Sequence, residues 1–168
     1  RIMAELVKVV VDAMGGDNAP EEPVKAAVEA VKEREDIFVI LTGLEDVIKK
    51  ELNKYQGYPE ERIQIVHTSE VIETAEPPGF AIRKKKDSSI VVGLNLVKKH
   101  EADAFVSAGN SGAVLVGGQL LVGKIKGVER PPLAPLIPTL KGVSLLIDCG
   151  ANVDARPSHL VQFAKMGS

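Results

Sequence analysis

The chain has 168 residues, of which 45% are hydrophobic and 26% charged, as is typical of an ordinary globular domain and not of a disordered chain. A net charge of -2, 4% aromatic residues and no Trp exclude a general attraction to nucleic acid or to an anionic membrane. The single cysteine, Cys149, excludes an internal disulfide framework, and the sequence contains no long apolar run or signal-peptide pattern. We therefore expect a cytoplasmic protein.

Apolar runs that alternate with amphipathic segments predict the secondary structure. The predicted strands are residues 6–12, 37–43, 62–68, 103–109 and 143–150. The predicted helices are residues 21–35, 44–55 and 88–100, the last capped by Ser88 or Ser89, and an apolar helix over 113–123. A polar connection precedes residue 88, and the proline-rich segment 129–138 is interpreted as irregular. This alternation predicts an α/β fold, a three-layer α/β/α Rossmann-like domain with a mostly parallel sheet, over residues 1–168.

Three small polar loops follow the first, fourth and fifth predicted strands. They are "DAMGGDNAP" (12–20), "SAGNSGA" (107–113) and "DCGANVD" (148–154). Because the carboxyl ends of parallel strands share one edge, we expect Asp12, Asn110, Ser111 and Asp148 to converge on one cleft. Gly and Asn also serve as turn and cap residues, and for one loop this explanation is equally good. Three such loops at equivalent positions favour a polar site, and the helix after "GNSG" favours an anion.

Other chemistry-bearing residues carry less weight. Residues 118–125, "GQLLVGKI", resemble a phosphate loop, but Ile125 stands where a hydroxyl must bind magnesium. The three histidines are far apart, so no metal site is predicted. Cys149 has no histidine near it in sequence and is interpreted as inert. The run "RKKKD" (83–87) is an exception, because it lies at the predicted ligand edge and suits a fixed anion or an acidic partner protein.

Several of these blocks, taken together, resemble the PlsX family of bacterial phosphate acyltransferases of phospholipid synthesis. The blocks are "VVVDAMGGDNAP", "AIRKKKDSS", "AFVSAGNSGA", "ERPPLAP" and "DCGANVD" followed by "LVQFAKMGS", in register from Leu6 to Ser168. The resemblance implies a fold like that of isocitrate and isopropylmalate dehydrogenases. It also implies conversion of acyl-[acyl-carrier-protein] and inorganic phosphate into acyl phosphate and free carrier protein, with no cofactor.

Family members are considerably longer, so the resemblance implies that this sequence is an N-terminal half. It stops at "MGS" in the expected middle of a helix, and Ser111 stands where Thr is more usual in the family. The family's second half implies a homodimer and peripheral association with the inner face of the cell membrane.

The resemblance, together with the loop chemistry, yields a set of expected site residues. Expected catalytic residues are Asn110, Asp12 and Asp148, and expected phosphate- or substrate-binding residues are Gly15, Gly16, Asp17, Arg83, Lys86, Ser107, Gly109, Ser111, Gly112, Gly150 and Asn152. Phosphate would attack the thioester directly, because a thiol leaves readily without an enzyme nucleophile.

Three alternatives stay open at this point. One is acyl transfer between coenzyme A and phosphate. Another is a metal-dependent NAD(P) dehydrogenase, in which Asp12, Asp17 and Asp148 would hold Mg²⁺. The third is an inactive fragment that retains only a binding surface.

Overall fold

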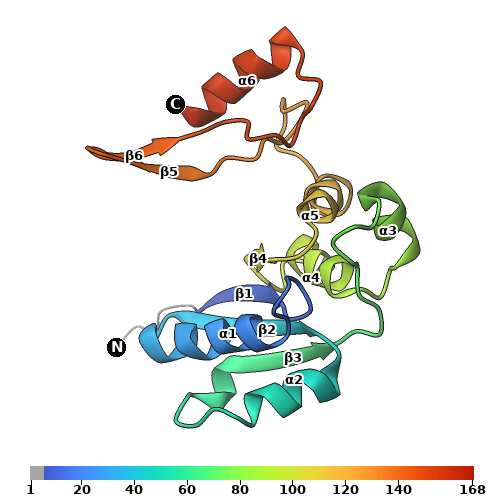
Figure 1. Ribbon diagram of the computed structural model, residues 1–168, viewed down its shortest axis with the longest axis vertical. Helices are drawn as coiled ribbons and strands as arrows, with labels where there is room; N and C mark the ends of the chain where they lie inside the picture. The colour runs from blue at the N-terminus through green and yellow to red at the C-terminus, as the bar shows by residue number, and fades with distance from the viewer. Residues whose placement is uncertain (1–5) are drawn as a thin grey trace. The chain divides into compact units, whose positions relative to one another are not determined.

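The structure is a computed structural model that describes residues 6–168, and the chain divides into two compact units. The first unit ends at Val122, and the second runs from Gly123 to Ser168. The elements of both units are labelled in Figure 1. Each unit is described by itself.

The first unit is built on a four-stranded, fully parallel sheet with the order β3-β2-β1-β4. Its strands are β1 (Val7–Asp12), β2 (Ile37–Gly43), β3 (Ile63–His67) and β4 (Ala104–Val106). The register places Val10 of β1 between Ile40 of β2 and Phe105 of β4. The first four predicted strands and their parallel arrangement are thus confirmed. As a result, the loops that follow β1 and β4 begin side by side.

The helices predicted between these strands are also confirmed, with ends that differ by a few residues. They are α1 (Glu21–Glu33), α2 (Glu45–Leu52), α4 (Ser89–Lys98) and α5 (Ser111–Gly117), which continues as a π-helical turn over Gly118–Val122. A short 3-10 helix, Glu60–Arg62, precedes β3. Ser88 caps α4 as predicted, because its Oγ accepts a hydrogen bond of 3.4 Å from the N–H of Val91.

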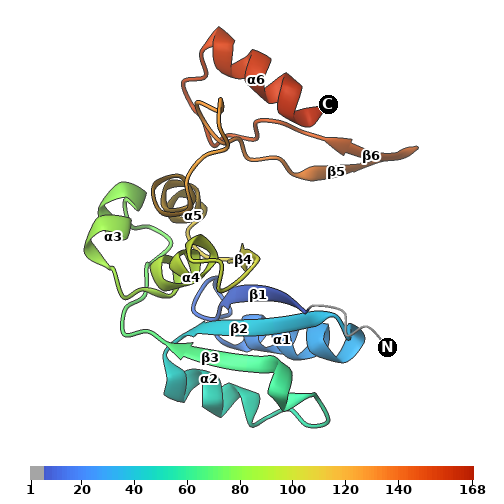
Figure 2. The ribbon, with the colours of Figure 1, turned by 180° about the vertical axis from the view of Figure 1, so that it is seen from behind.

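Helices cover both faces of the sheet, so the first unit has three layers. On one face, Val24 and Val31 of α1 and Ile48 of α2 pack with Val39 and Leu41. Figures 1 and 2 show this arrangement, with α1 in front of the strands in one view and behind them in the other. Helix α4 packs on the opposite face, where the core centres on Val10, Ile40 and Ala102. Strands covered on both faces read as continuous apolar runs, as β1 and β2 do.

One helix of the first unit was not predicted. Residues 78–84 lie in the segment interpreted as a polar connection, but they form α3 (Pro78–Lys84). Proline suits a first helical turn, where its missing N–H costs no hydrogen bond. Ala81 and Ile82 are buried in a cluster with α4 and α5, and this packing stabilises a helix too short to persist alone.

The second unit corrects two predictions. Residues 143–150 do not form a fifth parallel strand: β6 (Gly142–Leu145) pairs antiparallel with β5 (Leu136–Thr139) in a separate two-stranded sheet. Segment 129–138 is therefore not wholly irregular. A tight turn explains the pairing, since Gly142 has φ +140° and the hydroxyl of Thr139 donates to its carbonyl over 3.1 Å. The helix that the resemblance implies at the end of the sequence is present as α6 (Pro157–Gly167), with Phe163 buried.

A pair of helical glycines tests the packing of α4 on the sheet. A Cβ added at Gly93 would lie 2.4 Å from Phe105 Cε2 and 3.1 Å from Val10 Cγ1, whereas at Gly79 it meets nothing within 4 Å. We expect Gly93→Ala to lower the free energy of unfolding by about 1–3 kcal/mol. Gly79→Ala should leave it unchanged or raise it by up to about 1 kcal/mol. Urea unfolding of both variants measures this, and equal effects would contradict the packing described.

Candidate functional site

The carboxylate of Asp12, at the end of β1, is the buried centre of the candidate site. It is 1% exposed. Its Oδ2 accepts a hydrogen bond from the hydroxyl of Ser107 over 2.7 Å, and its Oδ1 accepts from the N–H of Met14 over 3.1 Å. Ser107 Oγ in turn accepts from the N–H of Gly109 over 3.0 Å. The carboxylate therefore joins the loop after β1 to the loop after β4.

The loop after β1 and the loop after β4 are in contact at a point where each of them carries a glycine. A Cβ at Gly15 would lie 2.5 Å from Asp12 Oδ2 and 2.9 Å from both Ser107 Oγ and the nitrogen of Gly109. Gly16 has φ +99°, a left-handed backbone that favours glycine, and lies against Ala108. The expected residues Gly15, Gly16, Ser107 and Gly109 thus meet around Asp12.

A pocket of about 460 Å³ opens beside these loops. Asp12, Gly15, Gly16, Asp17, Ser107 and Ala108 line it on the loop side, and Glu22 and Pro23 of α1 line it on the other. Across residues 6–168, no acceptor is found for the backbone N–H of Gly16, Asp17 or Asn18, all three of which border the pocket. Consecutive unpaired amides of this kind are typical of anion sites.

Asn110 does not face this carboxylate cluster but holds a different loop. As the N-cap of α5, its Oδ1 accepts from the N–H of Ala113 over 2.9 Å. Its Nδ2 donates to the carbonyls of Glu73, Thr74 and Glu76 at 3.0–3.2 Å. Both ends of the amide are therefore engaged, and the side chain is 5% exposed. In this structure Asn110 fixes the segment before α3 to the start of α5.

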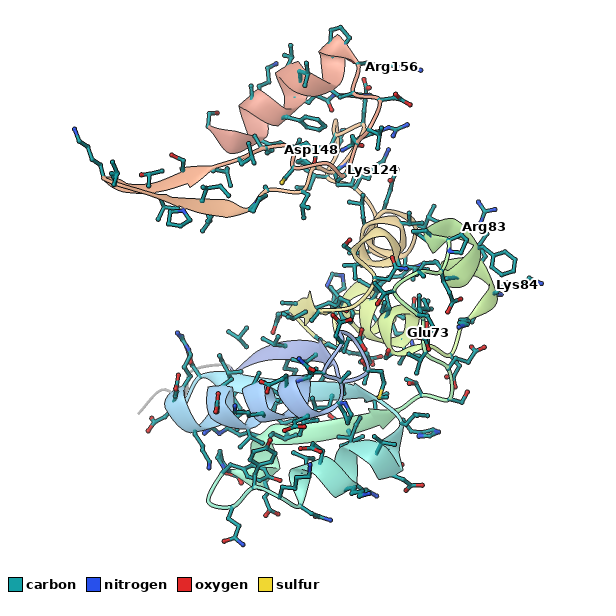
Figure 3. All side chains as sticks on the ribbon, viewed as in Figure 1. Glu73, Arg83, Lys84, Lys124, Asp148 and Arg156 are labelled. Atoms are coloured by element: carbon teal, nitrogen blue, oxygen red, sulfur yellow. The ribbon has the colours of Figure 1, made fainter. Side chains whose placement is uncertain are left out.

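In the basic run 83–87, Lys85 is paired within the first unit, and the other cations are exposed. Lys85 Nζ donates to the carbonyl of Val71 over 2.6 Å and forms an ion pair with Glu76, which lowers the pKa of that carboxyl chiefly through the hydrogen bond. Arg83 and Lys86 are exposed and do not line the pocket. Figure 3 shows Arg83 and Lys84 projecting outward from α3. The structure therefore does not bring Arg83 or Lys86 into the loop cluster.

The remaining expected residues divide between the units. Ser111 and Gly112 begin α5, and a Cβ at Gly112 would lie 2.5 Å from Pro78 Cγ, so this turn packs against α3. Asp148, Gly150 and Asn152 belong to the second unit. There Asp148 accepts from the N–H groups of Leu133 and Asn152, both at 2.7 Å.

These contacts govern the ionisation of Asp148. Burial is the largest single influence and raises its pKa, but the hydrogen bonds from Leu133, Asn152 and Ala151 together outweigh burial and leave the pKa below its ordinary value. Asn152 Nδ2 also donates to the carbonyl of Pro131 over 3.2 Å. Asp148 thus ties the "DCGAN" segment to the proline-rich segment within its own unit.

One contact of the first unit was missed by sequence reasoning. Glu76 and Lys85 link the Asn110 loop to α3, but their separation by a helix that was not predicted hid the pairing. Within residues 6–168, no group of three or more His, Cys, Asp or Glu side chains is arranged to hold a metal ion. None of the helices described is long and apolar enough to cross a membrane.

A sequence model of the family described as "Fatty acid synthesis protein" matches residues 7–168. The chain belongs to this family. Within the fatty acid synthesis proteins, it is 56% identical over 162 residues to a phosphate acyltransferase of Alkaliphilus oremlandii, covering 96% of this chain and 48% of that one. It is 51% identical to a phosphate acyltransferase of Clostridioides difficile, covering 96% and 47%. The chain spans about half the length of these curated relatives.

Solved structures show the same fold in this member of the family. A phosphotransacetylase from Streptococcus pyogenes superposes with a TM-score of 0.67 and 18% identity, over 95% of this chain and 51% of that one. The EutD phosphotransacetylase from Staphylococcus aureus gives a TM-score of 0.65, also at 18% identity, over the same shares. At this identity the likeness shows the α/β fold alone, with its mostly parallel sheet.

Gly15→Ala tests the contact between the two loops. The added methyl has no space among three polar atoms, so we expect the loops to separate and the free energy of unfolding to fall by about 1–3 kcal/mol. Gly118→Ala is the matched control, because a Cβ there meets nothing within 4 Å. Urea unfolding and the amide NMR shifts of Ser107 and Gly109 measure the effect. Unperturbed shifts in Gly15→Ala would show that the loops do not touch.

Asp148→Asn tests the anchor in the second unit. A carboxyl whose pKa is lowered on folding adds stability above its unfolded pKa of about 3.9, and this is lost as the pH falls through the lower folded value. At pH 7 we expect a roughly fivefold drop in amide-exchange protection at Leu133 and Asn152, since the group is only half-buried and contributes about 1 kcal/mol. Asp154→Asn, exposed in the same loop, should change neither amide. Equal effects of both substitutions would contradict the anchor.

Proposed function

We propose that this protein forms acyl phosphate from acyl-[acyl-carrier-protein] and inorganic phosphate, as an acyltransferase of phospholipid synthesis. The observation that carries the proposal is the junction of two glycine loops around Asp12, beside a pocket bordered by three unpaired amides. Two comparisons also support the proposal. The chain belongs to the fatty acid synthesis family, and its relatives are named phosphate acyltransferase. The narrower fold assignment, to the isocitrate dehydrogenase type, is part of the same proposal.

Phosphate would bind at the amide-bordered end of the pocket. The N–H groups of Gly16, Asp17 and Asn18 offer donors to its oxygens at the start of the segment that leads into α1. Asp12 would not touch phosphate as a free anion, because its oxygens already accept from Ser107 and Met14. Its role is to orient Ser107 and to hold the two loops together, and so to fix the donors before substrate arrives.

The reaction needs no covalent enzyme intermediate. A phosphate oxygen attacks the thioester carbonyl carbon and forms the C–O bond of the acyl phosphate, while the C–S bond breaks. The electron pair of that bond leaves with sulfur, and the thiolate takes a proton to become the thiol of the free carrier protein. Catalysis then rests on positioning and on fixed donors for the developing oxyanion.

The other expected residues have different places in this proposal. Asn110 acts as a positioning residue, because its amide holds segment 73–76 against α5. Asp148, Gly150 and Asn152 lie in the second unit and remain candidate substrate-binding residues. A cytoplasmic homodimer, peripheral to the inner face of the membrane, completes the proposal.

The proposed activity is tested on the complete gene product. Acyl-[acyl-carrier-protein] and phosphate are supplied, and acyl phosphate is trapped with hydroxylamine and measured as the hydroxamate. We expect turnover, and Asp12→Asn should lower kcat/KM for phosphate by roughly 100-fold, because the amide puts a donor where Ser107 needs an acceptor.

Asp103→Asn is the matched control. That carboxylate also accepts a backbone hydrogen bond, from the N–H of Lys8 over 2.7 Å, but it precedes β4 and so lies at the opposite end of the same strand pair. It should change kcat/KM by less than about twofold. Turnover only with coenzyme A thioesters, or only with NAD(P) and a hydroxy acid, would refute the proposal. So would equal losses in Asp12→Asn and Asp103→Asn.

A further inference from the structure

Helix α3 and the residues just after it present a compact cationic surface with one aromatic side chain in it. Arg83, Lys84 and Lys86 are all exposed, and Phe80 is 61% exposed on the same helix. Lys84 Nζ lies 5.8 Å from the centroid of the Phe80 ring, within the range of a cation–π contact. We call these four residues the α3 patch, and Figure 3 shows Arg83 and Lys84 at its outer side.

The acids near the α3 patch are already engaged. Glu76 pairs with Lys85, the one member of the basic run that turns inward. Asp87 accepts from the N–H and the hydroxyl of Ser69, at 2.9 and 2.5 Å. Neither carboxylate is paired with Arg83, Lys84 or Lys86 among the ion pairs of the described residues. The patch therefore keeps its positive charge in a chain whose net charge is -2.

An exposed Phe on the same helix as an exposed Arg matches the composition of surfaces that bind other proteins. Aromatic side chains and arginine are enriched where proteins bind one another, whereas a purely solvated helix face carries polar residues. The buried side of α3 already supplies the packing that the helix needs, through Ala81 and Ile82. Phe80 is thus free to contact something outside the first unit.

We propose that the α3 patch is the docking surface for the acidic carrier protein that brings the acyl thioester, with its cations facing acidic side chains and Phe80 at the centre of the contact. This rests on the proposed function. Lys85, which lies between two members of the patch in sequence, connects this segment to the start of α5: it pairs with the Glu76 carboxylate, and Asn110 donates to the Glu76 carbonyl over 3.0 Å. Docking there would place the carrier protein beside the start of α5.

Binding of the carrier protein in its apo form, which lacks both the prosthetic arm and the acyl group, tests the surface without any turnover. The complete gene product is titrated with labelled apo-carrier by fluorescence anisotropy at two salt concentrations. We expect Phe80→Ala combined with Lys84→Glu to raise Kd at least tenfold, and the salt dependence of Kd to become weaker. Lys98→Glu, at the exposed end of α4, makes the same change in net charge and is the charge-matched control; it should change Kd by less than about twofold.

Each outcome bears on the inference. Equal weakening by the Phe80 and Lys84 variant and by Lys98→Glu would mean that only net charge matters and would overturn the inference, as would unchanged binding by the Phe80 and Lys84 variant. Loss of binding to vesicles of anionic phospholipid, with carrier binding intact, would assign the patch to a membrane instead. The hydroxamate assay of the wild-type protein reports separately on the proposed activity, so a docking failure and an activity failure give different results.

Discussion

The hydrogen bond between Asp12 and Ser107 is the constraint on which the first unit's site depends. It joins two loops that are distant in sequence, and it can form only because β1 and β4 are neighbours in the sheet. A carboxylate that is 1% exposed is stable only when its oxygens have donors, and here a hydroxyl and a backbone N–H supply them. The same contact requires Gly15, because no side chain fits between the loops. The contact between Asp12 and Ser107 therefore depends on three features together: the order of the strands, the buried carboxylate and the glycine at position 15.

A second set of hydrogen bonds fixes the start of α5. Asn110 uses its whole amide, capping α5 with oxygen and holding three carbonyls with nitrogen. Such a residue gives rigidity to its surroundings and has no atom left for substrate in this arrangement. The loop after β4 is thus held at Ser107 by one network and at Asn110 by another. Ser111 and Gly112 lie directly after both.

Much of the first unit could be predicted from its pattern, because parallel strands covered on two faces produce long apolar runs separated by amphipathic helices. The meeting of Asp12 with Ser107 and Gly109 follows from that pattern, since strand ends of a parallel sheet share an edge. The partner of the strand predicted at residues 143–150 could not be predicted in this way. A short apolar run indicates a strand but not its partner, and a tight turn at Gly142 pairs this one with β5. Helix α3 was hidden for another reason: its stability comes from Ala81 and Ile82 packing on α4 and α5, which no local pattern reveals.

The division of the basic run has a consequence for how such sequences are compared. Lys85 faces inward to Glu76 while its neighbours in sequence face solvent, so four adjacent cations perform two unrelated tasks. Helix α3 ends at Lys84 and Lys85 is its C-cap with φ -92° and ψ 70°, so the task of each cation is set by its position at the helix end and not by the composition of the run. Deleting one lysine would leave a segment that is still basic, but a different side chain would then occupy the position that pairs with Glu76. Alignments that slide this run by one residue would therefore equate positions that share a charge but not an environment.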